Sequence, residues 1–168
     1  MYTSALTSAL RVDLCLTEGQ LLRHFGLTLE QLNSRLYVLN ACIGQTAESI
    51  QKIPTRFVSL YNHRVDATVL RHWAATAEVR HQLNIDLESW AAVRTQGPVM
   101  LPDAVWYRGK ERIAVEIDTA SYRPGVVLEK VRYFSSSFDG LIWAATSQRR
   151  ANSLALRYGL EALVVNWQ

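Results

Sequence analysis

Cysteines and histidines are scarce in this chain, and each shortage excludes a class of site. Cys15 and Cys42 are the two cysteines; they form no CxxC pair and have no histidine at a ligand-like spacing. We therefore expect reduced core cysteines, without a disulfide framework or a zinc site. The four histidines form no HExxH pattern. This argues against a histidine-centred metal or catalytic site.

Long apolar runs and linkers are also missing. No segment approaches the roughly 20 apolar residues that a membrane span requires. Residues 1–4 lack the basic region and apolar run of a signal peptide. We therefore expect a cytoplasmic protein with no membrane partner. There is no internal repeat, low-complexity tract or linker rich in proline and glycine, which favours two units packed against each other.

The chain is nearly half apolar and mildly basic. Apolar residues make up 49% of the 168 residues, and the net charge is +3. A chain of this length and composition can bury a core. The charge permits nucleic-acid binding without requiring it, so the case for such a partner depends on local clusters of basic residues.

Residues 1–64 carry the pattern of a helix-turn-helix. Thr17 begins a capping pattern that predicts a short helix, which ends at Gly26. Thr28 begins a second capping pattern, and leucines at helical spacing extend a second predicted helix to Leu39. Two helices separated by so short a turn are typical of a helix-turn-helix.

An alternating segment at residues 55–61 predicts a strand after these helices, in the position of a wing. The order helix, turn, helix, strand resembles a winged helix, which would bind double-stranded DNA. The alternative is a helical hairpin that forms a homodimer or packs on the second unit. The residues predicted to contact bases or phosphates are Gln31, Asn33, Ser34, Arg35, Arg56 and Arg64.

Residues 65–168 predict a mixed α/β unit. The predicted elements are a helix from Asp66 to Leu83, a strand at 90–93, a turn at 96–98, a hairpin from 104 to 118, a helix opening near Pro124, a strand at 141–145, a helix from Ser147 to Tyr158 and a strand at 162–165. The polar side chains Arg71, His72, Glu78 and Arg80 are expected on the outer face of the first helix. The predicted order of elements is αβββαβ, followed by one more helix and one more strand. The strands are expected to form one sheet with helices packed on it.

Acidic residues gather at the mouth of the predicted hairpin. Asp103 precedes its first strand, and Glu116 and Asp118 share one face of its second strand. Carboxylate oxygens suit Mg²⁺ or Mn²⁺, so these three residues are the candidate metal ligands, with the Ile117 carbonyl as an addition. The alternatives are a turn residue at Asp103 and a solvated sheet face for the other two acids.

This arrangement resembles the PD-(D/E)xK nuclease signature. The resemblance implies that Asp103 and Glu116 hold the metal ion, and that a lysine two positions after the glutamate polarises the attacking water. Asp118 occupies that lysine position here. Lys130, on the following helix, is the best replacement, and Tyr133 is expected one turn further along the same face. The predicted catalytic residues are therefore Asp103, Glu116 and Lys130.

Short motifs extend the resemblance over nearly the whole chain. Pro102-Asp103-Ala104, residues 114–119, residues 128–133 and residues 146–150 resemble the pattern of the replication-relaxation family. That resemblance implies a winged helix at 1–64 joined to a nuclease-like domain at 65–168. It also implies a role in plasmid replication or mobilisation, beside a replication or mobilisation protein.

Two arginines at the start of the last predicted helix complete the candidate DNA contacts. Arg149 and Arg150 lie where the helix dipole does not favour positive charge, which suggests a phosphate partner. Their alternative is a surface pair with Asp139 or Glu161.

Three functions follow from these patterns. The first is a DNA-binding protein with a nuclease-like, inactive domain that acts in replication, mobilisation or transcription of a mobile element. The second is an active endonuclease or nickase that depends on Mg²⁺ or Mn²⁺. The third is a non-enzymatic interaction module that touches no nucleic acid.

Overall fold

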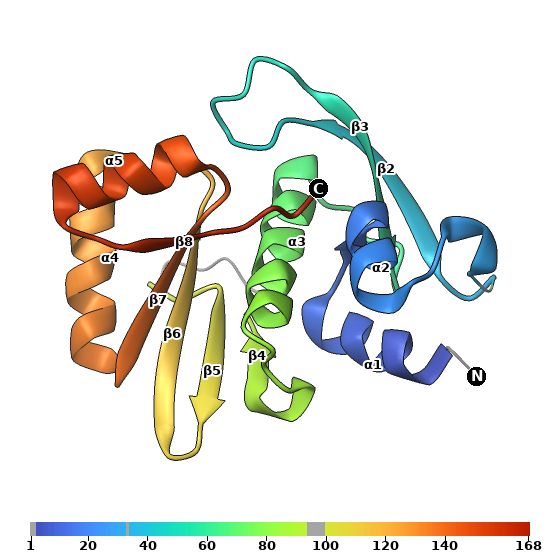
Figure 1. Cartoon of the computed structure of the whole chain (residues 1–168), viewed down its shortest axis with the longest axis horizontal. Helices are drawn as coiled ribbons and strands as arrows, with labels where there is room; N and C mark the ends of the chain where they lie inside the picture. Colours follow the sequence, from blue (N-terminus) through green and yellow to red (C-terminus); the bar gives the residue numbers. More distant parts are fainter. Residues whose placement is uncertain (1–2, 33, 94–99) are drawn as a thin grey trace.

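Two β-sheets flank one central helix, α3 (Ala67–Gln82) (Figure 1). The computed structural model describes residues 3–32, 34–93 and 100–168. One sheet has three strands in the order β1-β3-β2, and the other has five in the order β4-β5-β6-β7-β8. This confirms the predicted mixed α/β class. No helix among the described residues is long and apolar enough to span a membrane.

The first sheet is built entirely within residues 1–64. The elements in order are α1 (Thr3–Asp13), β1 (Leu16–Thr17), α2 (Glu18–Phe25), the 3-10 turn η1 (Leu29–Gln31), β2 (Tyr37–Ile43) and β3 (Ile53–Ser59). All strand pairs in this sheet are antiparallel. A single 3-10 turn stands where the second helix of the predicted helix-turn-helix was expected.

Helix α2 begins and ends where the sequence predicts. The Thr17 hydroxyl accepts a hydrogen bond from the Gln20 backbone N–H at 3.1 Å, and the Gln20 side chain accepts one from the Thr17 backbone N–H at 2.9 Å. Gly26 ends the helix with a φ of 64°, in the left-handed region that favours glycine.

The predicted second helix is wrong. The capping pattern does form, because the Gln31 side chain accepts a hydrogen bond from the Thr28 N–H at 2.8 Å, but it supports only η1. Leu39 lies in β2, opposite Phe57 of β3. Every second residue of β2 faces the core: Leu39, Ala41 and the buried Ile43. This strand periodicity prevails over the helical spacing of the leucines.

The second sheet follows the predicted order of elements. They are η2 (Leu87–Ser89), β4 (Trp90–Ala92), β5 (Ala104–Arg108), β6 (Glu111–Asp118), α4 (Pro124–Ser137), β7 (Gly140–Ala145), α5 (Gln148–Tyr158) and β8 (Ala162–Val164). Strands β4, β5 and β6 are antiparallel, whereas β6, β7 and β8 are parallel. The turn predicted at 96–98 lies outside the described residues.

The two faces of this sheet meet different helices. Val115 and Ile117 of β6 pack in one core cluster with α3. Trp143 of β7 packs on the opposite face with α4 and α5, in a cluster that includes Val127 and Leu154. Since side chains alternate along a strand, the face that carries Glu116 is the one covered by α4 and α5.

The outer face expected for α3 is wrong, because this helix is buried between the sheets. Arg71, Glu78 and Arg80 are all buried. Arg80 forms two hydrogen bonds with the Asp13 carboxylate, at 2.8 and 2.6 Å, and Arg71 donates one to the Gly44 carbonyl at 3.2 Å. Partners from the first 64 residues offset the cost of burying these charges, although the Arg71 Nε atom has no hydrogen-bond partner.

The C-terminal segment ties the second sheet back to the first. The buried Trp167 ring stacks on Phe57, with ring centroids 6.1 Å apart. Its indole N–H donates to the Gln45 carbonyl at 3.1 Å, and its own carbonyl accepts from the Thr17 hydroxyl at 2.8 Å. Residues from both sheets therefore contribute to one hydrophobic core.

Candidate active site

The structure brings together the three predicted catalytic residues. Ala104 of β5 pairs with Val115 of β6, so Asp103, one position earlier, lies beside Glu116 at the end of the hairpin. Helix α4 then returns over this face and brings Lys130 to Glu116. The pairing of two neighbouring strands and one crossover helix thus assembles a site from residues that are 27 positions apart in the sequence.

Glu116 is the buried centre of the site. Its side chain is fully buried, and its Oε1 atom accepts hydrogen bonds from the Lys130 ammonium group and from the Tyr122 hydroxyl, the latter at 2.5 Å. The Lys130 Nζ atom also donates to the Tyr122 oxygen at 3.1 Å. Glu116 and Asp118 are both fully buried, so the alternative of a solvated sheet face is wrong.

Asp103 connects the hairpin to α3. One carboxylate oxygen accepts a hydrogen bond from the Ile117 backbone N–H at 2.7 Å, and the other lies 2.6 Å from the His72 Nε2 atom. The side chains of Asp103 and His72 remain 18% and 23% exposed, so solvent reaches this end of the site. Asp103 therefore does more than close a turn after Pro102.

His72 is a site residue that the sequence did not reveal. The sequence pattern put it on the outer face of α3 and gave no histidine motif. The element that it faces, the start of β5, comes about thirty positions later in the chain, so no local spacing could signal the contact. Tyr122, just before α4, is a second site residue for which the sequence gives no signal.

Burial and mutual charge shift the pKa values in the site. Burial, helped by the nearby negative charge of Asp103, raises the pKa of Glu116 to about 7, against the lowering effects of Lys130 and Tyr122. Burial lowers the pKa of His72, but the charge and hydrogen bond of Asp103 outweigh it, so this pKa lies above its usual 6.5. Burial and the charge of Glu116 raise the pKa of Tyr122, which keeps its hydroxyl protonated.

Asp118 is not placed as a third metal ligand. Arg150 binds its carboxylate with two hydrogen bonds, at 3.0 and 2.8 Å, and the Ala120 N–H adds a third at 2.8 Å. Arg150 therefore pairs with Asp118 and not with Asp139 or Glu161, the alternative partners expected for it, and its phosphate role stays a prediction. A buried carboxylate needs a charged partner. Arg150, in the first turn of α5, is that partner for Asp118.

The other predicted DNA contacts are spread over the molecule. Arg56 forms two hydrogen bonds with Glu18 on the surface, at 2.8 and 2.6 Å. Gln31 caps η1, and Asn33 lies outside the described residues. The remaining candidates are exposed and stay predictions: Ser34 and Arg35 before β2, Arg64 before α3, and Arg149 in the first turn of α5.

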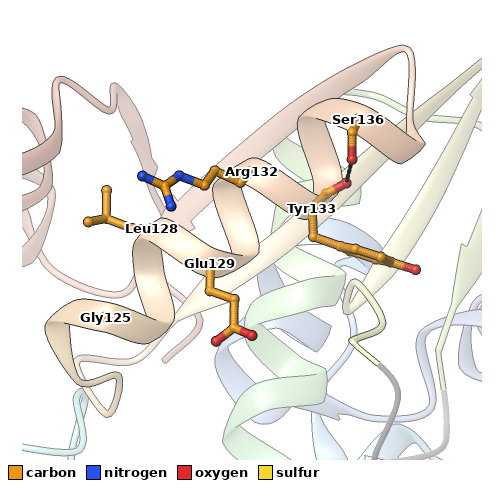
Figure 2. A pocket seen from close by; sticks show the side chains of 6 residues that line it. All are labelled: Gly125, Leu128, Glu129, Arg132, Tyr133 and Ser136. Atoms are coloured by element: carbon orange, nitrogen blue, oxygen red, sulfur yellow. Dashed lines mark hydrogen bonds between the residues drawn. The ribbon is translucent and has the colours of Figure 1, made fainter.

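The outer side of α4 carries a shallow groove that is separate from the acidic site (Figure 2). Six side chains from this one helix line it: Gly125, Leu128, Glu129, Arg132, Tyr133 and Ser136. Tyr133 was predicted to share a face with Lys130, but it lines this groove and is 40% exposed. The offset of three positions carries its ring away from Glu116.

Asp103 and Glu116 are the two carboxylates that would hold a hard divalent cation here. Two carboxylates, those of Asp103 and Glu116, lie close enough that the charge of the first raises the pKa of the second. The Glu116 Oε2 atom is buried and has no hydrogen-bond partner. Among the described residues no three His, Cys, Asp or Glu side chains form a metal-binding group. Mg²⁺ is commonly held by one or two carboxylates, with water and substrate phosphates completing its shell.

The chain was also compared with known proteins. No protein-family model matches it. No curated protein and no solved structure is significantly similar to it. The resemblances to PD-(D/E)xK nucleases and to the replication-relaxation family therefore stay predictions.

Proposed function

We propose that this chain binds DNA and hydrolyses a phosphodiester bond at the site of Asp103, Glu116 and Lys130. One observation carries the proposal: the Lys130 ammonium group lies against the Glu116 carboxylate, although Asp118 occupies the usual lysine position. Two acids at one end of the hairpin, with a lysine beside the second, form the set of charges that phosphodiester hydrolysis requires.

Asp103 and Glu116 would hold Mg²⁺ or Mn²⁺. The bound cation would offset negative charge on the phosphate and lower the pKa of a bound water. The lysine contributes a second positive charge at the same place. Its side chain is 15% exposed, so solvent reaches part of it.

Tyr122 and His72 support the charged residues. The Tyr122 hydroxyl accepts from Lys130 and donates to Glu116, which fixes the position of both charged groups. His72 lies on the outer oxygen of Asp103 and keeps that carboxylate turned toward the sheet edge. Both contacts restrict side-chain rotation before substrate arrives, which favours a preorganised site.

Nicking of supercoiled plasmid tests the proposal. We expect nicks with Mg²⁺ or Mn²⁺ that disappear in EDTA and in Asp103→Asn and Glu116→Gln. Glu129→Gln is the matched control, because Glu129 is an exposed glutamate on α4 beside Lys130. Equal nicking by Asp103→Asn and the wild type would overturn the assignment of the site.

A second candidate is a DNA-binding protein whose site does not cleave. It is favoured by the ion pairs that already occupy both carboxylates, His72 with Asp103 and Lys130 with Glu116. Anisotropy titrations with duplex DNA at two salt concentrations test it, since phosphate contacts give a steep salt dependence. Binding without nicking in any divalent cation would favour this candidate. In either form we propose a role in replication, mobilisation or transcription of a mobile element, on the resemblance alone.

A further inference from the structure

The loop between β2 and β3 is fixed at its base. We call residues 44–52 the tip loop. The Gly44 and Gln45 carbonyls accept hydrogen bonds from Arg71 and Trp167, at 3.2 and 3.1 Å. The Ala47 N–H donates to the Thr119 carbonyl at 2.7 Å. The tip loop is therefore held against the second sheet.

The fold of the tip loop is also tight. A Cβ atom on Gly44 would lie 2.4 Å from the Ser49 Cβ atom, so glycine is required there. The Ser49 hydroxyl accepts a hydrogen bond from the Thr46 N–H at 3.0 Å, which closes the turn. A side chain beyond this turn has a defined position.

Ile50 is the large apolar side chain that this loop exposes to solvent. It is 100% exposed, whereas the isoleucines at the base of the hairpin, Ile43 and Ile53, are 4% and 38% exposed. Isolated exposed apolar residues are common on protein surfaces. An isoleucine with no cover at all, directly after a turn whose first half is anchored to the second sheet and the C-terminal segment, is suited to insertion into another molecule.

The tip loop lies near the candidate active site. Its anchor Thr119 follows Glu116 by three positions, which corresponds to about 10 Å along an extended chain. That length is roughly three base pairs of DNA. Arg150, at the start of α5, binds Asp118, the residue just before Thr119. Figure 1 shows the β2–β3 loop reaching over toward this end of α5.

Basic side chains accompany these elements. Lys52, Arg123 and Arg149 are exposed, and none of them forms a salt bridge within the described parts of the chain. They lie at the end of the tip loop, just before α4, and in the first turn of α5. Exposed cations in the tip loop and on the segments next to its anchor favour a polyanion with stacked bases over an apolar protein surface.

We infer that Ile50 is a wedge that enters the base stack of DNA beside the candidate active site. This inference rests on the DNA binding proposed above. Apolar wedges in architectural DNA-binding proteins unstack a base step at a cost of a few kcal/mol. A duplex that is already weakened at one step avoids that cost, so the ligand class is DNA with a mismatch, a nick or another flexible step.

Binding to two duplexes tests the wedge. One is fully paired, and the other carries a single mismatch; both contain 2-aminopurine beside that step. We expect wild-type protein to bind the mismatched duplex about tenfold more tightly in anisotropy titrations, which is about 1.4 kcal/mol of the unstacking cost. The 2-aminopurine fluorescence should rise on binding. Ile50→Ser should lose both the preference and the rise while still binding DNA.

Leu156→Ser is the matched control, because Leu156 is 88% exposed on α5, away from the tip loop. It should behave as the wild type. An unchanged preference in Ile50→Ser would overturn the wedge and leave the proposed function standing. Failure of the wild type to bind either duplex at low salt would overturn both. A concentration-dependent dimer in sedimentation that Ile50→Ser abolishes would make Ile50 a protein contact and also overturn the wedge.

Discussion

The second sheet buries the Glu116 carboxylate, and its two oxygens differ in the number of their hydrogen-bond partners. One oxygen accepts from Lys130 and Tyr122, and the other has none. Such an arrangement stabilises a fold poorly, because a buried charge costs free energy that its partners only partly return. Buried groups with shifted pKa values gather at functional sites. The residue is best explained by what binds there.

The raised pKa of Glu116 predicts that stability falls with rising pH. Its pKa is about 7 in the folded chain and 4.5 otherwise, so the favourable contribution is complete below pH 4.5 and is lost as the pH rises through 7. We expect the wild type to lose roughly 2 kcal/mol more than Glu116→Gln between pH 4.5 and 8. Urea unfolding at several pH values measures this. Parallel curves for the two proteins would show that Glu116 does not titrate in this window.

Lys130 should matter for the chemical step far more than for folding. Lys130→Met keeps the aliphatic chain and removes the charge, and we expect nicking to fall by about 10²- to 10³-fold, the usual cost of losing one group that stabilises developing charge. Tyr133→Phe, a change in the groove on the outer side of the same helix, should leave the rate unchanged. Equal loss in the two variants would point to a general effect on α4.

The sequence alone predicts some residues of the candidate active site and not others. Asp103 and Glu116 could be predicted from strand alternation and the hairpin turn, and Lys130 from the resemblance to nucleases in which this lysine lies on the following helix. His72 could not, since its contact depends on how α3 packs against the sheet. The pair of Asp118 and Arg150 was missed for the same reason. Charges four or fewer positions apart leave a local pattern, whereas these pairs are more than thirty positions apart.

Among the elements, those with strong end signals were predicted best. Helix α2 has a capping residue at one end and a left-handed glycine at the other, and α5 begins at the predicted Ser147 cap. The helix predicted up to Leu39 failed, because Leu39 also fits the alternating pattern of β2, and Tyr37–Ile43 pairs along its whole length with β3. Tertiary pairing decided between two local patterns of similar strength.

The burial of α3 predicts unequal effects of two arginine changes. Arg80→Ala leaves the Asp13 carboxylate buried without its partner, which should cost about 3–5 kcal/mol of unfolding free energy. Arg56→Ala removes an ion pair whose side chains are 50% and 38% exposed, and should cost at most about 1 kcal/mol. Urea denaturation of both variants measures the contrast. Similar costs would contradict the central placement of α3.

The molecule as a whole is held together by its shared core and its C-terminal segment. Trp167→Ala removes a buried ring that stacks on Phe57, and should cost about 3–5 kcal/mol. Because residues of both sheets share one cluster, we expect a single unfolding transition in calorimetry. Two separate transitions in the wild type would show that the sheets unfold independently.

Cation binding at Asp103 and Glu116 can be measured without knowing which DNA the chain acts on. Calorimetric titration of the folded protein with Mn²⁺ is the most direct test. We predict one bound ion per chain in the wild type and in Glu129→Gln, and none in Asp103→Asn or Glu116→Gln. Equal Mn²⁺ binding by all four proteins, or none by the wild type at millimolar Mn²⁺, would contradict a cation-dependent site at this hairpin.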